Sequence, residues 1–155
     1  LLDNAVLAWG LLACGLAQFS KLIFELIQYR RWRPAVLIET GGMPSSHSAL
    51  VTGTASGIGL QLGFDDPIFA MAAIFSFVVM YDASGIRRAA GLTAASVNKL
   101  VGETPSTENS LKENLGHTRL EVLIGSLFGP AVALPGIVFI GSPFDLAHMF
   151  GLFIK

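Results

Sequence analysis

A run of eight residues, Gly-Gly-Met-Pro-Ser-Ser-His-Ser at positions 41–48, combines hydroxyl groups, a histidine and two glycines. Glycine permits backbone angles that other residues avoid, and proline is favoured at the first position of a helix. Ser45 and Ser46 therefore stand at a predicted helix start, where free N–H groups and the helix dipole favour a bound anion. His47, in the first turn, is placed to donate a proton to a phosphate ester oxygen. The alternative is a capped helix start with an incidental histidine.

His117 and Glu121 form a second constellation, because residues four apart share one face of a helix. A carboxylate so placed can hold one imidazole nitrogen and leave the other free to act as a nucleophile. An ordinary polar pair at a helix start has the same spacing. Spacing alone therefore favours neither the nucleophile nor the ordinary polar pair.

Arg87 and Arg88 are candidate phosphate-binding residues, since guanidinium groups are preferred binders of phosphate oxygens. Adjacent arginines after an apolar helix are also common interface anchors. Asp82 is placed to pair with either arginine, but one carboxylate is weak evidence for a divalent ion, and we predict no metal or other cofactor. Lys21 lies deep in an apolar stretch, where a charged group usually faces a protein interior or snorkels to the interface.

Four apolar stretches must position these side chains. A membrane span needs about 20 apolar residues, and the second stretch is rich in small residues that allow close helix packing in lipid. The chain is 52% hydrophobic and only 14% charged, below the ~25% typical of soluble domains. We therefore predict an all-α, polytopic membrane helical bundle with four transmembrane helices; a soluble helical bundle is the alternative. The predicted helices are Ala5–Tyr29, Ser46–Leu62, Pro67–Tyr81 and Leu120–Ile140, followed by a short amphipathic segment over Pro143–Lys155.

Length, charge and cysteine content narrow the class further. The 155 residues suit a single membrane domain, 1–155. A net charge of -1 provides no broad basic field, so nucleic acid is not an expected partner. Cys14 is the one cysteine, which excludes a disulfide within the chain. No basic segment followed by a cleavage site opens the sequence, which predicts no signal peptide; a missing segment upstream of Leu1 is an open alternative.

The distribution of charge predicts an orientation. Lysine and arginine gather between the first and second helices and between the third and fourth, and basic residues prefer the cytoplasmic side. This places the N-terminus outside and both basic loops inside. With four spans the two loops share one membrane face whichever way the chain inserts, so the candidate site residues meet there.

Together these segments resemble the superfamily of type 2 phosphatidic acid phosphatases and vanadium-dependent haloperoxidases. The shared order is a lysine followed by Arg-Pro, then Pro-Ser-x-His, then a histidine with an acidic residue four positions later. The runs Gly-Gly-Met-Pro-Ser-Ser-His-Ser, Met-Tyr-Asp-Ala-Ser-Gly-Ile-Arg-Arg and Leu-Lys-Glu-Asn-Leu-Gly-His look more closely like its divergent membrane branch, in the style of cyanobacterial members. The resemblance covers residues 17–129, most of the chain.

The resemblance implies a phosphomonoesterase. His117 would take the phosphoryl group, Glu121 would orient it where the wider family has aspartate, and His47 would protonate the leaving alcohol. The implied phosphate-binding residues are Lys21, Arg33, Ser45 and Ser46, joined by Arg87 and Arg88.

The chain departs from the wider family at two places. Lys21 stands farther from Arg33 than the family spacing, and the place of the arginine upstream of the nucleophile holds Leu111, with Lys112 next to it. Arg87 or Arg88 would supply the missing guanidinium from another loop, and Lys112 and Asp82 are candidate supporting residues.

Two functions fit these residues. The first is a membrane phosphatase that hydrolyses a lipid or polyprenyl phosphate through a phosphohistidine intermediate. The second is a non-catalytic membrane subunit, assembly factor or lipid-binding protein that retains the phosphate pocket. A haloperoxidase would use the same anion pocket, but no residue here supports it.

The expected partners are membrane lipid, a phosphate-bearing amphiphile, and a second copy or a larger membrane complex. The expected location is a bacterial plasma or thylakoid membrane, with the site on the cytoplasmic face.

Overall fold

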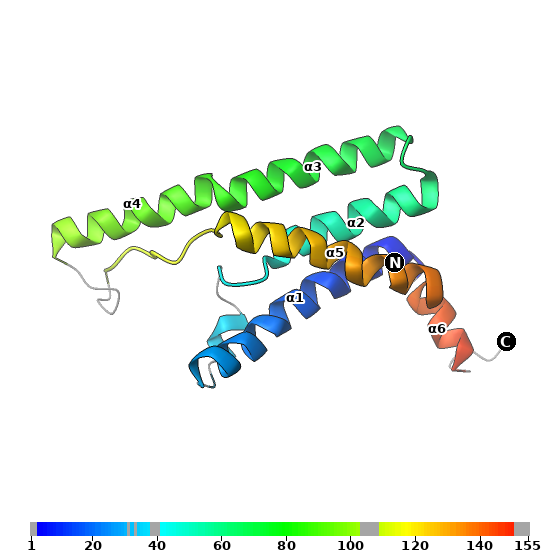
Figure 1. Cartoon of the computed structure of the whole chain (residues 1–155), viewed down its shortest axis with the longest axis horizontal. Helices are drawn as coiled ribbons and strands as arrows, with labels where there is room; N and C mark the ends of the chain where they lie inside the picture. The colour runs from blue at the N-terminus through cyan, green and yellow to red at the C-terminus, as the bar shows by residue number, and fades with distance from the viewer. Residues whose placement is uncertain (1–2, 31, 33, 38–40, 103–108, 151–155) are drawn as a thin grey trace.

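The computed structural model describes residues 3–30, 32, 34–37, 41–102 and 109–150. Every regular element in these ranges is a helix, and no strand occurs among them (Figure 1). The predicted all-α bundle is therefore confirmed. The elements in chain order are α1 (Ala5–Tyr29), the 3-10 helix η1 (Pro34–Leu37), α2 (Ser46–Leu62), α3 (Pro67–Ser84), α4 (Ile86–Val101), α5 (Arg119–Phe139) and α6 (Pro143–Met149).

Helix α2 forms the centre of the bundle and packs against α1, α3 and α5. Small residues make up much of its contact surface, among them the buried Ala49, Gly53 and Gly57. At Gly129 of α5 the two backbones approach so closely that an added Cβ would overlap the Ala49 carbonyl oxygen and lie 2.7 Å from the Gly53 nitrogen. Helices pack this closely only where side chains are small, so packing explains the composition of α2.

Gly129→Ala is expected to destabilise the bundle by about 1–3 kcal/mol, the usual cost of overpacking. Gly15→Ala in α1 is the matched control, because no atom lies within 4 Å of an added Cβ there and alanine is the better helix former. Thermal unfolding of both variants in one detergent measures the difference. Equal melting temperatures would contradict the close contact between α2 and α5.

Within the described ranges, three helical stretches are long and apolar enough to cross a membrane: Ala5–Gln28, Pro67–Val101 and Arg119–Phe139. Helix α2, the other predicted span, has 17 residues, the lower end of the spanning range of about 17 to 25, and lies between its neighbours. The predicted C-terminal amphipathic segment contains α6, which ends at Met149; residues 151–155 lie outside the described ranges.

The third helix and the segment after it differ from the prediction. Helix α3 continues past Tyr81 to Ser84, and α4 follows directly after Gly85. Hydropathy did not indicate α4, because its alanine, arginine and leucine residues favour a helix by propensity but form no long apolar run. The polar region predicted as a loop is therefore partly helical, and α3 and α4 extend in nearly one line (Figure 1).

The ends of the helices that carry the candidate residues lie toward one end of the bundle (Figure 1). There α1 ends, α2 begins, α3 ends and α5 begins, so distant parts of the sequence come together. Helix α4 projects beyond this end, and the segment that returns to α5 runs beside it.

Candidate active site

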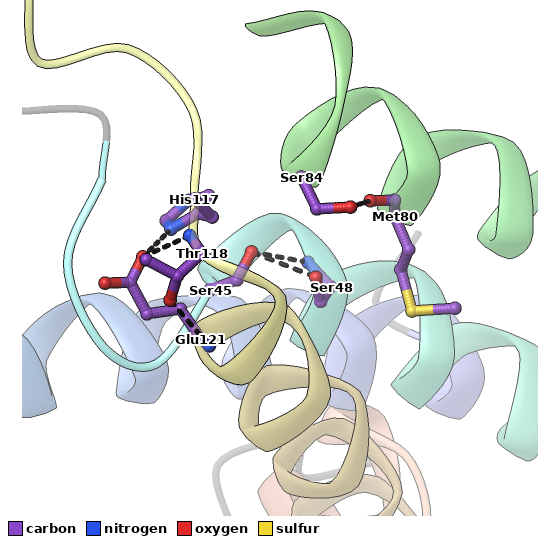
Figure 2. Close-up of polar contacts among 7 residues, drawn as sticks. All are labelled: Ser45, Ser48, Met80, Ser84, His117, Thr118 and Glu121. Atoms are coloured by element: carbon purple, nitrogen blue, oxygen red, sulfur yellow. Dashed lines mark hydrogen bonds and ion pairs between the residues drawn. The ribbon is translucent and has the colours of Figure 1, made fainter. Parts of the chain in front are cut away.

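The best-defined part of the site is the pair His117 and Glu121 at the start of α5. The imidazole Nδ1 lies 3.1 Å from Glu121 Oε2, and His117 is buried. The same carboxylate oxygen accepts a hydrogen bond from Thr118 N at 3.1 Å, and Thr118 Oγ1 accepts one from Glu121 N at 3.3 Å (Figure 2). This capping box holds the carboxylate in place. When His117 Nδ1–H donates to it, Nε2 carries the free lone pair.

Burial is the largest influence on His117 and lowers the pKa of its imidazole below the usual value. The hydrogen bond to Glu121 opposes this shift, whereas the positive charges of Lys21 and His47 add to it. The balance favours a neutral ring at neutral pH, which is the form that a nucleophilic histidine requires.

Glu121→Gln is expected to lower the pKa of His117 further, because the hydrogen bond and the charge of Glu121 both raise it. Histidine NMR spectra recorded against pH in detergent micelles measure the midpoint. Glu113→Gln serves as the control, since the Glu113 carboxylate is hydrogen-bonded to Asn98. A midpoint that rises in Glu121→Gln would contradict the pairing of His117 with Glu121.

His117 also lines a narrow cleft of about 20 Å³ together with His47 from α2 and Arg87 from α4. Arg87 and Lys21 both act electrostatically on His47, and of these two cations Arg87 lines the cleft. Arg87 Nε pairs with Asp82 Oδ2 at 2.6 Å, which fixes the orientation of the guanidinium. A cleft of this volume holds about one water molecule, so these residues form one wall of a candidate phosphate site and do not enclose a phosphate. A guanidinium in that wall suits phosphate oxygens.

Arg88 lines a different and larger cavity of about 460 Å³, which His117 and Glu121 also border. Of the two adjacent arginines, Arg87 is the one that shares the narrow cleft with His47. Lys112 is exposed and lines neither cavity. The phosphate-binding role of Arg88 and the supporting role of Lys112 stay predictions.

Lys21 faces the protein interior. Only 3% of its surface is exposed, and its Cδ lies 3.8 Å from the place of a Cβ added to Gly42. Electrostatic interactions join Lys21 to Glu121, His47 and His117. Such burial does not fit snorkelling to the interface. Lys21 lines neither of the two cavities and influences the histidines through its charge.

The serines at the start of α2 serve the fold. Ser45 is fully buried, and its Oγ accepts hydrogen bonds from Ser48 N at 3.3 Å and Ser48 Oγ at 2.9 Å (Figure 2). Ser45 N donates to the carbonyl oxygen of Glu121 at 3.1 Å, which ties α2 to α5 beside the His117–Glu121 pair. Ser46 is also buried. Phosphate binding by these two serines stays a prediction, and the Ser45 hydroxyl already caps the helix.

Arg33, another predicted phosphate-binding residue, lies outside the described ranges. Among the residues that the structure describes, no group of three or more His, Cys, Asp or Glu side chains is arranged to hold a metal ion.

Sequence reasoning missed two residues that hold the site together. Thr118 completes the capping box with Glu121, and the pattern Thr-x-x-Glu at 118–121 is a readable signal for it. Asn98 of α4 forms hydrogen bonds with Leu111 and Glu113, upstream of His117. No local motif indicates Asn98, because its partners lie in a separate, irregular segment.

Comparison with known proteins identifies the family of the chain. Residues 2–132 match the model of the Divergent PAP2 family, and this range contains all the candidate residues from Lys21 to Glu121. The protein of Bacillus subtilis (strain 168) named Uncharacterized membrane protein YuiD is 38% identical over 149 residues, which cover 86% of this chain and 94% of the relative. No solved structure matches the chain significantly. With its apolar helices and this match, the chain is an integral membrane protein that belongs to the Divergent PAP2 family.

Proposed function

We propose that this protein is a membrane phosphatase that hydrolyses a lipid or polyprenyl phosphate through a phosphohistidine intermediate. The observation that carries the proposal is the buried His117, held by Glu121 through Nδ1, beside a cleft that His47 and Arg87 also line. Phosphoryl transfer depends mainly on positioning and on positive charge around the phosphate oxygens. Lys21 does not line this cleft, but its charge acts on both histidines.

The chemistry proceeds in two displacements. His117 Nε2 attacks phosphorus, the P–O ester bond breaks, and the alcohol oxygen leaves with the electron pair and takes a proton from His47. Water then attacks the phosphohistidine and gives a proton to His47, while the P–N bond breaks and its electron pair returns to Nε2. Inorganic phosphate is released. Arg87, oriented by Asp82, takes the place of the arginine that the wider family has upstream of the nucleophile.

The substrate is an amphiphile that reaches the site from the membrane. The excess of lysine and arginine in the segments around the site supports a cytoplasmic orientation, in a bacterial plasma or thylakoid membrane. The same proposal includes assembly of the protein into a homodimer or a larger membrane complex.

A non-catalytic, anion-binding membrane subunit is the second candidate. It is favoured by the Ser45 hydroxyl, which is engaged by Ser48, and by Leu111 at the position where the wider family has arginine. Such a protein would keep the cationic cleft for an anionic lipid headgroup and would turn over no ester.

Release of inorganic phosphate from a panel of phosphatidic acid, a polyprenyl monophosphate and p-nitrophenyl phosphate tests the proposal. The purified protein in detergent is expected to hydrolyse at least one amphiphile. Material purified in parallel from cells without the protein controls for contaminating phosphatases. Folded protein that releases no phosphate across the panel would contradict catalysis and leave the anion-binding subunit as the function.

A further inference from the structure

The segment that carries His117 is an irregular strap, residues 109–118, which lies along α4 (Figure 1). At Gly91 of α4 the strap is so close that an added Cβ would overlap the Glu113 carbonyl oxygen and lie 3.2 Å from Leu115 N. The strap has no regular secondary structure, so its backbone polar groups need partners from elsewhere.

Asn98 supplies hydrogen-bond partners for the strap. It is buried, with only 3% of the residue exposed. Its Nδ2 donates to the Leu111 carbonyl oxygen and to Glu113 Oε1, both at 2.8 Å. Its Oδ1 accepts a hydrogen bond from Leu111 N at 2.9 Å. The carboxamide thus pairs with both backbone groups of Leu111, as a neighbouring strand would, and holds the Glu113 side chain as well.

The other end of the strap is attached to the same pair of helices. His117 N donates to the Ala83 carbonyl oxygen of α3 at 2.9 Å, and Gly116, at φ 78°, lies against the backbone of Arg87 and Arg88. The strap is therefore held at Asn98 and at the α3–α4 junction. Loss of the Asn98 attachment removes the hydrogen bonds at the end of the strap that is farther from α5.

We propose that Asn98 is a positioning residue for His117: by holding the strap on α4, it keeps the imidazole aligned with Arg87 and His47. Asn98 does not touch the phosphate and acts through the strap. The activity readout of this proposal rests on the proposed phosphatase function, whereas the second readout below does not.

The proposal is tested by exchanging the donor of Asn98 and the acceptor of Glu113 between the two positions. Asn98→Asp replaces the donor by a carboxylate facing Glu113, so like charges oppose each other. Glu113→Gln keeps an acceptor for Asn98. The double variant Asn98→Asp, Glu113→Gln restores a donor–acceptor pair between positions 98 and 113 and keeps the acceptor for Leu111 N, but it does not restore the donor to the Leu111 carbonyl oxygen. Asn4→Ala, which removes one side-chain hydrogen bond at the start of α1, controls for general loss of stability.

We expect kcat of Asn98→Asp to fall roughly 10- to 100-fold, as a small misplacement of a catalytic group does, with KM changed by less than about twofold because ground-state binding is retained. Glu113→Gln and Asn4→Ala are expected to stay near the wild type. The double variant is expected to recover part of the loss, because the pair between positions 98 and 113 is restored but the donor to the Leu111 carbonyl oxygen is not.

The titration midpoint of His117, followed by histidine NMR, is the readout that needs no turnover. It is expected to rise in Asn98→Asp, as the ring loses burial, and to return in the double variant. If Asn98→Asp does not fold, recovery of the fold in the double variant is the expected rescue. The proposal is overturned if the double variant recovers none of the three properties: the fold, the titration midpoint of His117 and the activity. It is also overturned if Asn98→Asp has the same His117 titration midpoint as the wild type.

Discussion

His117→Ala is expected to reduce phosphate release from every substrate by more than about 10³-fold, because removal of a nucleophile that acts together with its partners abolishes nearly all catalysis. The physical reason lies in the hydrogen bonding of the His117 imidazole. Its Nδ1 is held by Glu121 at 3.1 Å, so its Nε2 is the nitrogen available to form the P–N bond.

Two further measurements separate a nucleophile from a structural histidine. His148→Ala changes the histidine of α6, which lies outside both cavities of the site, and is expected to retain activity. Added imidazole is expected to restore part of the activity of His117→Ala by entering the vacated space. A His117→Ala protein that stays folded and active would exclude the phosphohistidine mechanism.

His47→Asn is expected to slow the hydrolysis of alkyl phosphates by about 10²- to 10⁴-fold, the usual contribution of general acid catalysis. The same variant is expected to lose far less activity toward p-nitrophenyl phosphate. An alcohol is a poor leaving group until its oxygen is protonated, whereas a nitrophenolate leaves without a proton. His47 lines the cleft beside His117 and Arg87, where a leaving oxygen would lie.

The ratio of the two rates is the informative quantity, because it cancels differences in folding and in the amount of active protein. Arg87→Gln is the comparison variant, since loss of positive charge around the phosphate should slow both substrates alike. Equal losses for alkyl and aryl phosphates in His47→Asn would show that His47 is not the general acid.

The sequence by itself determined most of the helices, with α4 as the exception, and it singled out the candidate residues of the site. Ala5–Tyr29 and Ser46–Leu62 were predicted with the bounds that the structure has, because apolar runs, glycine and proline act over a few neighbouring residues. The sequence singled out His117 and Glu121, but a shared helix face was the wrong reason. His117 precedes Thr118, the N-cap of α5, and the capping box turns the Glu121 carboxylate back toward the imidazole. Alternating helix directions then brought the polar segments to one end.

Only the tertiary structure decided which of the charged residues share the cleft. Adjacent residues of a helix point about 100° apart, so the choice between Arg87 and Arg88 depends on how α4 follows Gly85 and packs against the strap. The burial of Lys21 depends on parts of the chain far from α1, because its Cδ lies beside Gly42 and its charge interacts with Glu121 of α5. Asn98 was invisible to local pattern because its hydrogen bonds cross to a segment 13 and 15 residues away, and such contacts exist only after the chain has folded.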